Sequence, residues 1–170
     1  MCIRDRQKGF SLIELLIVVA IILIIAAIAI PNLLRARIAA NESSAVSSVR
    51  TINTAEVTYQ TAFPATGYSL TLAALGGPAA ACVPAVGNAC LIDNVLSTGA
   101  KSGYAFAAVG APANGSATNV VYTVGAAAQI FNQTGVRSFC SNEDAVIRAQ
   151  TPAGQVAPTT ANPCNFTVLQ

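Results

Sequence analysis

The longest apolar run of the chain lies near its N-terminus. Residues 15–30 are sixteen apolar residues in succession, and Glu14 is the single charged residue between Phe10 and Leu34. A bilayer core is about 30 Å thick and is crossed by about 20 apolar residues in a helix. We therefore expect a transmembrane helix over residues 10–34. A secretory signal peptide is the main alternative, but its apolar region usually runs about 7–15 residues and ends in a small-residue cleavage site.

The pattern then narrows to a single apolar stripe. After residue 44, apolar residues recur at steps of three and four, which predicts an amphipathic helix. The stripe consists of Ala45, Val49, Ile52, Ala55, Tyr59 and Phe63. The polar residues that lie largely off it are Arg37, Asn41, Glu42, Ser48 and Asn53. The two patterns together predict one helix over residues 10–63, with a kink or loosening at Pro31, where a backbone hydrogen bond is lost.

Alternation with a period of two appears only after residue 103. Residues 64–101 are rich in Gly, Pro and Ala, which predicts a loop with one short helix near residues 70–75. Four strands are expected at residues 104–107, 119–124, 135–139 and 145–149, with the turn between the last two at residues 141–144. The predicted fold class is α+β, with a long N-terminal helix packed on a small antiparallel sheet. The predicted organisation is a leader at residues 1–9, the helix at 10–63 and a globular domain at 64–170.

Five cysteines are present, of which Cys2 stands alone ahead of the apolar run. An even number of cysteines in an exported domain predicts disulfides. Three pairings of the other four are possible. We favour the sequence-local one, Cys82 with Cys90 and Cys140 with Cys164, in which Cys164 ties the tail to the sheet; free buried thiols are the alternative. The spacings lack the close CxxC-type pairs of a four-cysteine zinc site, and we predict no metal and no cofactor.

Charge and composition narrow the function. The chain has nine basic and seven acidic residues, and its excess positive charge lies wholly within residues 1–9. A basic flank before an apolar run stays cytoplasmic. The neutral body gives no indication of a nucleic-acid surface. There is no histidine, the commonest general base, and no P-loop pattern, so we do not expect an enzyme.

One motif leads directly into the apolar run. Residues 8–14 read Lys-Gly-Phe-Ser-Leu-Ile-Glu, which resembles the class III signal of type IV prepilins and of type II secretion pseudopilins. The resemblance covers about residues 7–60 and implies cleavage between Gly9 and Phe10 by a prepilin peptidase, followed by N-methylation of Phe10. It also implies an assembly role for Glu14 and a helix-loosening role for Pro31. Many family members have a glycine in the middle of the apolar segment, and this chain does not. Residues 1–6 are not especially leader-like.

The chemistry of these residues supports the same roles. Gly9 has no side chain, so a protease can close on the backbone there. A carboxylate at the bilayer centre costs about 2.5–3.5 kcal/mol on insertion scales unless it is paired. Cleavage creates a cation, the amine of Phe10, with which Glu14 can pair in the same chain or in a neighbouring one. The simpler alternatives are that Glu14 snorkels to the membrane surface, that Phe10 is an interfacial aromatic and that Pro31 is a kink without function.

The resemblance implies a structural subunit of a type IV pilus, used for adhesion, motility or DNA uptake. Its partners would be copies of itself, the prepilin peptidase, an inner-membrane assembly platform with its ATPase, and the bacterial inner membrane before export to an extracellular filament. The alternative is a pseudopilin of type II secretion. Major pseudopilins commonly bind calcium through an acidic loop, whereas Glu143-Asp144 is the only adjacent acidic pair here; calcium takes about 6–8 oxygen ligands. No aromatic residue lies between Phe10 and Tyr59, so we expect no aromatic conduction path.

Overall fold

The structure is a computed structural model that describes residues 11–78, 80–113, 117–151, 164 and 167–169. These residues belong to two compact units, Met1–Ala36 and Arg37–Gln170. The expected leader, the cleavage site Gly9 and the methylation site Phe10 lie outside the described residues.

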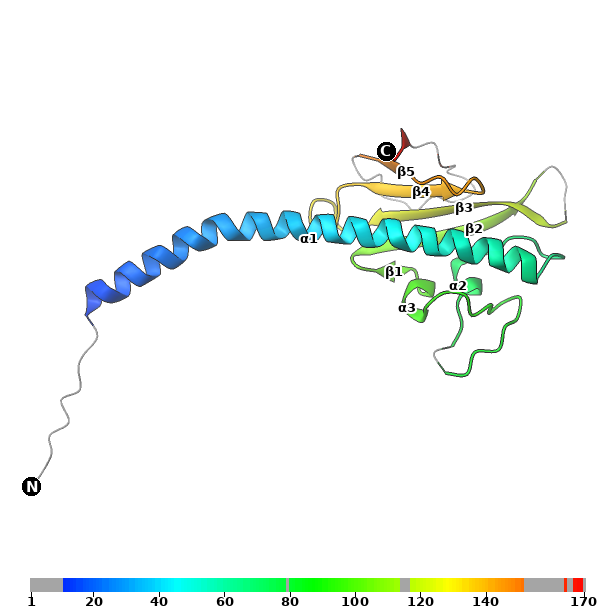
Figure 1. Cartoon of the computed structure of the whole chain (residues 1–170), viewed down its shortest axis with the longest axis horizontal. Helices are drawn as coiled ribbons and strands as arrows, with labels where there is room; N and C mark the ends of the chain where they lie inside the picture. The colour runs from blue at the N-terminus through cyan, green and yellow to red at the C-terminus, as the bar shows by residue number, and fades with distance from the viewer. Residues whose placement is uncertain (1–10, 79, 114–116, 152–163, 165–166, 170) are drawn as a thin grey trace, which may run out of the picture. The chain divides into compact units, whose positions relative to one another are not determined.

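A single long helix runs through both units, as the apolar patterns predicted. Helix α1 spans Leu12–Ala62, a length of 51 residues, and continues through Pro31 without a break in its helical assignment (Figure 1). Its end is fixed where residue 64, a proline, follows Phe63. The amides of Thr66 and Gly67 both donate to the carbonyl of Phe63, at 3.0 and 3.1 Å. Gly67 has φ +80°, a conformation that suits glycine at the end of a helix.

The second unit contains a six-stranded antiparallel sheet in which every strand pairs with its neighbour in the chain (Figure 1). Its strands are β1 (Ala100–Lys101), β2 (Tyr104–Pro112), β3 (Asn119–Ala128), β4 (Ser138–Asn142), β5 (Arg148–Gln150) and β6 (Thr167–Val168). The predicted α+β fold class and the antiparallel meander are confirmed.

Several element boundaries differ from the sequence-based prediction. Strand β4 begins three residues later than expected and takes in residues 141 and 142, which we had assigned to the turn. Their side chains alternate poorly in polarity, so the pattern hid the strand. The short helix near residue 70 is confirmed as α2 (Leu72–Leu75). Helix α3 (Asn94–Ser97) and strand β1 fall in a stretch that we expected to be loop, and β6 was not predicted.

The core of the second unit lies between the apolar stripe of α1 and one face of the sheet. On the helix, the stripe residues from Ala45 to Tyr59 are at most 4% exposed. On β2, buried and half-buried residues alternate, as expected for a strand with one face on the core. The largest fully buried side chains include Tyr59, Tyr104, Tyr122 and Phe139. The stripe prediction is therefore confirmed, and the sheet holds the C-terminal part of α1 by its apolar face.

Candidate assembly segment and the anchoring of its helix

In the first unit, the large apolar side chains of the helix are exposed. Every large apolar side chain from Leu12 to Leu34 is between 44% and 72% exposed. The segment is long and apolar enough to cross a membrane. Removing apolar surface from water is worth about 25 cal/mol per Å², so this segment is stable only where lipid or other apolar helices surround it.

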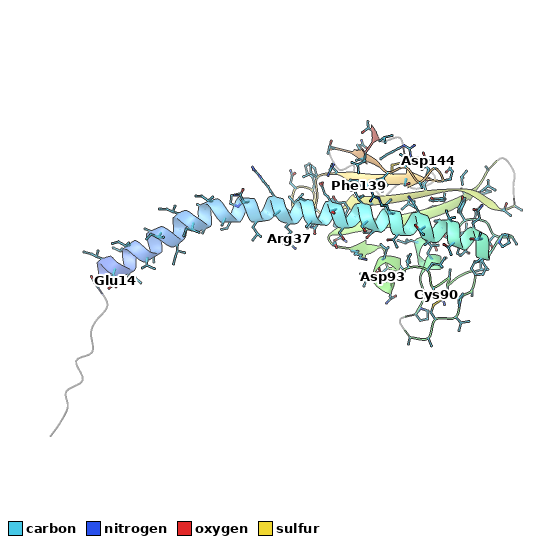
Figure 2. The ribbon with its side chains drawn as sticks, viewed as in Figure 1. Glu14, Arg37, Cys90, Asp93, Phe139 and Asp144 are labelled. Atoms are coloured by element: carbon cyan, nitrogen blue, oxygen red, sulfur yellow. A yellow bond between two sulfur atoms is a disulfide. The ribbon has the colours of Figure 1, made fainter. Side chains whose placement is uncertain are left out.

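Glu14 is the exception within this apolar segment. It lies in the first turn of α1, where the helix dipole favours a negative charge. Its side chain is exposed, and no salt bridge is recorded for it among the described residues (Figure 2). Its expected partner, the amine of Phe10, lies outside the described residues, as does Gly9. Pro31 is exposed within the continuous helix, and its loosening role stays a prediction.

The buried face of α1 carries polar residues that the sequence analysis placed elsewhere. We expected Glu42, Ser48 and Asn53 to lie largely off the apolar stripe, but all three are buried, as is Glu56. The spacing holds the signal that was missed. Residues 42, 45, 49, 52, 56 and 59 follow steps of three and four, so the two glutamates occupy positions on the buried stripe itself.

Glu42 joins the start of the packed part of α1 to the strand β4 region. One carboxylate oxygen accepts from the amides of Val136 and Arg137, at 2.9 and 3.1 Å. The other accepts from the Arg137 side chain through Nε and Nη2, both at 2.8 Å. Arg137 also lies over the ring of Phe139, with 5.5 Å from its guanidinium carbon to the ring centroid. Four donors therefore satisfy one carboxylate that is only 7% exposed.

Glu56 is fully buried at the middle of the core without a cation recorded beside it in the described part of the chain. Its carboxylate accepts from the amide and the hydroxyl of Ser69, at 2.9 and 2.6 Å. Burial raises the pKa of the Glu56 carboxyl, and the two hydrogen bonds from Ser69 offset only part of that rise. Glu56 thus fastens the chain after α1 back onto the helix at a cost in desolvation.

The cysteines lie in the sequence-local pairing that we favoured. Cys82 is bonded to Cys90, in the loop between α2 and α3, and Cys140 of β4 is bonded to Cys164. The first disulfide is half-buried, and Figure 2 labels Cys90 in that loop. The second is in the core, with Cys140 fully buried.

The only adjacent acidic pair forms part of the turn between β4 and β5. Asp144 makes a salt bridge with Arg148 and accepts from the amide of Val146 at 2.9 Å. Arg148 lowers the pKa of the Asp144 carboxyl. Figure 2 shows Asp144 at the end of the sheet. Its oxygens hold this turn together, and Glu143 beside it is exposed.

Comparison with known proteins identifies the N-terminal segment. Residues 4–30 match the family described as the prokaryotic N-terminal methylation motif. The chain is 45% identical over 56 residues to the type IV major pilin protein PilA of Myxococcus xanthus, covering 33% of this chain and 26% of that one. It is 66% identical over 38 residues to the type IV wide pilus major component PilA4 of Thermus thermophilus, covering 22% and 29% of the two chains. No solved structure matches the chain significantly.

The fold and this segment together define a pilin-like protein: a long apolar N-terminal helix packed, in its later part, on a small antiparallel sheet. Residues 4–30 carry the N-terminal methylation motif, and the N-terminal segment is similar to those of two type IV pilins. The matched region spans just over a quarter of the length of these curated relatives. The resemblance inferred from residues 8–14 is therefore confirmed.

Proposed function

We propose that the chain is the structural subunit of a type IV pilus, processed at its N-terminus and polymerised through its apolar helix. The observation that carries this proposal is the apolar segment of α1: its large apolar side chains are exposed, it contains one carboxylate, and it lies largely within the matched methylation motif at residues 4–30. Adhesion, motility and DNA uptake are the roles that such a filament would serve.

In the proposed sequence of events, the chain first sits in the bacterial inner membrane as a single-pass precursor. A prepilin peptidase cuts between Gly9 and Phe10 and methylates the new amine. Methylation leaves the amine protonatable, so Phe10 keeps a positive charge. An assembly platform and its ATPase then extract the helix from the lipid into an extracellular filament, where other copies replace the lipid around it.

Glu14 sets the register of that filament in this proposal. A lone carboxylate among packed apolar helices carries a large desolvation cost. Pairing with the amine of Phe10 on a neighbouring copy neutralises both charges at one axial position only. Pro31 is proposed to let the helix loosen locally during extraction, since its backbone nitrogen cannot donate a hydrogen bond.

The test is intact-mass spectrometry of filaments sheared from cells that express the chain. The expected mass is that of a chain beginning at N-methylated Phe10, reduced by four hydrogens for two disulfides. A processed chain confined to the inner membrane, with no surface filament containing it, would instead favour the pseudopilin of a type II secretion system. A chain that still carries Gly9 in surface filaments would overturn the proposed processing.

A further inference from the structure

The loop between β3 and β4 holds two large apolar side chains in solvent. Ile130 is 51% exposed and Phe131 is 47% exposed. We call this pair the apolar knob. Neither residue belongs to the core of the second unit. Large exposed apolar groups that are clustered on a surface mark an interaction site more often than isolated ones do.

The loop that carries the knob is held in a fixed conformation. The amides of Gln133 and Thr134 donate to the carbonyl of Ile130, at 3.2 and 3.0 Å, and the Ile130 amide donates to the Thr134 hydroxyl at 3.1 Å. Asn132 has φ +60°, the left-handed conformation of a tight turn. Asn41 of α1 donates to the Thr134 carbonyl at 3.0 Å. A loop fixed in this way loses little conformational entropy when its apolar side chains bind a partner.

An apolar hollow of about 310 Å³ lies elsewhere on the same unit, against the last turns of α1. We call it the apolar hollow; its lining includes Tyr59, Leu70, Ala73, Ala74 and Val86. Leu70 is 58% exposed and Val86 is 49% exposed, so the rim is open to solvent. The walls are rigid, because the Tyr59 hydroxyl donates to the Val86 carbonyl at 2.7 Å and the Cys82–Cys90 disulfide closes the loop that carries Val86.

The knob and the hollow lie at opposite ends of the packed part of α1. The knob loop is hydrogen-bonded to Asn41. Tyr59 lines the hollow and is hydrogen-bonded to Val86, which also lines it. Eighteen helical residues at about 1.5 Å each separate Asn41 from Tyr59 by about 27 Å. Figure 1 shows the β3–β4 loop near the middle of α1 and the loop beyond α2 near its C-terminal end. The knob of one copy therefore cannot fill its own hollow.

We propose that the apolar knob of one copy inserts into the apolar hollow of the next copy along the filament. Two different patches on one chain that fit each other form a head-to-tail contact, and repetition of such a contact gives an open helical polymer rather than a closed dimer. Phe131 supplies an aromatic anchor for a pocket whose lining includes Tyr59. Aromatic anchors in preformed pockets carry most of the binding energy of protein interfaces. This inference rests on the proposed function, because it needs a filament.

The first test is cysteine cross-linking in assembled filaments. We would make the double variant Phe131→Cys with Leu70→Cys, and the matched control Phe131→Cys with Val168→Cys, since Val168 is 55% exposed on β6 and does not line the hollow. Mild oxidation should give a ladder of covalent multimers from the first pair only. A disulfide needs Cα atoms within about 7 Å, and within one copy the two positions lie on loops at opposite ends of the packed part of α1, so each cross-link reports two copies.

The second test uses substitutions that either remove the knob side chain or fill the hollow. Phe131→Ala removes the anchor and Ala74→Leu fills the hollow, and each should release roughly tenfold more monomer from sheared filaments under mild detergent. Val168→Ala serves as the control and should leave release unchanged. Near-ultraviolet circular dichroism of the full chain in detergent verifies that each variant is folded.

The outcomes separate this inference from the proposed function. If the wild-type chain forms no filament, the proposed function itself fails. If filaments form and no ladder appears although both cysteines react with maleimide, the contact is wrong while the function stands. A ladder of equal strength from the control pair would also overturn it. So would a Phe131→Ala effect confined to membrane retention of the precursor, because the knob would then be touching lipid.

Discussion

At the scale of single residues, α1 carries two buried glutamates whose carboxylates are satisfied by different kinds of partner. Glu42 is satisfied by two amides and by the side chain of Arg137, so its charge is balanced. Glu56 receives only the amide and hydroxyl of Ser69. The desolvation cost of a buried carboxylate is offset less when no cation lies beside it. The two residues therefore predict opposite results when their charge is removed.

Replacing Glu42 with Ala should destabilise the second unit by about 2 kcal/mol. The change leaves the amides of Val136 and Arg137 without their acceptor, and a buried donor that is left unsatisfied costs about 1–3 kcal/mol. The ion pair itself adds little, because the Arg137 side chain is 43% exposed. Denaturant unfolding of the detergent-solubilised chain, followed by the near-ultraviolet signal of buried tyrosines, measures the effect.

The control for this prediction is Glu143→Ala, which removes an exposed carboxylate from the β4–β5 turn. It should change the free energy of unfolding by no more than about 0.5 kcal/mol, as surface substitutions usually do. Equal losses from the two variants would show that Glu42 does not anchor the helix to the sheet.

Replacing Glu56 with Gln should stabilise the chain at neutral pH. The glutamine keeps an acceptor for the Ser69 amide and offers an NH₂ group to the Ser69 hydroxyl, without burying a charge. In the wild-type chain the raised pKa of Glu56 means that the folded state binds its proton more tightly than the unfolded state. The resulting stability is fully present below the ordinary pKa of 4.5 and is lost as the pH rises through the raised value.

The advantage of Glu56→Gln over the wild type should therefore be small near pH 4 and should grow as the pH rises toward 8. Unfolding curves for both chains across this range provide the measurement, with Glu143→Gln as the matched exposed control. An advantage that did not change with pH would mean that Glu56 keeps its ordinary pKa in the folded chain.

At the scale of elements, the helix could be predicted from the sequence far better than the sheet. Residues 15–30 are an unbroken apolar run, and from Ala45 on the apolar residues recur at steps of three and four, which together predict one long helix. The buried glutamates could not be predicted from polarity, although both lie at the spacing of the apolar stripe. Strands β1 and β6 have two residues each, which is too short for any alternation to appear. Their pairing depends on neighbouring strands, and a local pattern does not contain that information.

Helix α3 shows what local chemistry does encode. Asp93 caps it by accepting from the amide of Leu96 at 2.7 Å, and Asp93 also pairs with Lys101 at 3.0 Å. These interactions, the bond to Leu96 first, lower the pKa of the Asp93 carboxyl. An aspartate three residues before a buried leucine is a recognisable start signal for a helix. The Gly- and Pro-rich composition around it concealed that signal.

The two disulfides should differ in strength and in accessibility. Replacing both Cys140 and Cys164 with Ser should cost about 3.5 kcal/mol, against about 2.5 kcal/mol for Cys82 and Cys90, because the larger loop loses more entropy in the unfolded chain. The sequence separations are 24 and 8 residues. Mild reductant without denaturant should open the half-buried Cys82–Cys90 bond first, since Cys140 is fully buried. Differential alkylation with peptide mass mapping measures the order, and prior opening of Cys140–Cys164 would contradict it.

At the scale of the whole molecule, the N-terminal segment and the globular unit differ in how much of their role could be predicted from the sequence. The N-terminal segment predicts a membrane or filament location, because an apolar run with a basic flank and one carboxylate is typical of few kinds of segment. This part of the candidate site could be predicted and matches a known motif. The surface of the globular unit that is proposed to contact other copies could not be predicted from the sequence. The apolar knob consists of residues 130–131, and the apolar hollow is lined by loops near residues 70 and 86 together with Tyr59; only the fold brings the parts of the hollow together.

Substitutions at Gly9 and Glu14 should separate the processing of the chain from its assembly into filaments. Gly9→Leu places a branched side chain at the proposed cleavage point, so the leader should stay attached and no amine should form at Phe10. Glu14→Gln should leave cleavage intact but remove the charge that pairs with that amine. Both variants should accumulate in the inner membrane and reduce surface filaments by tenfold or more, about 1.4 kcal/mol or greater per copy.

Their intact masses distinguish the two defects. The Gly9→Leu chain should retain residues 1–9, whereas the Glu14→Gln chain should begin at N-methylated Phe10. Ser11→Ala serves as the control, because it alters an exposed residue within the motif without changing charge and leaves Gly9, Phe10 and Glu14 in place, and it should assemble normally. If Glu14→Gln chains entered filaments at the wild-type level, the carboxylate would be serving only as a membrane-surface group. The register of the filament would then have to come from contacts of the globular unit alone.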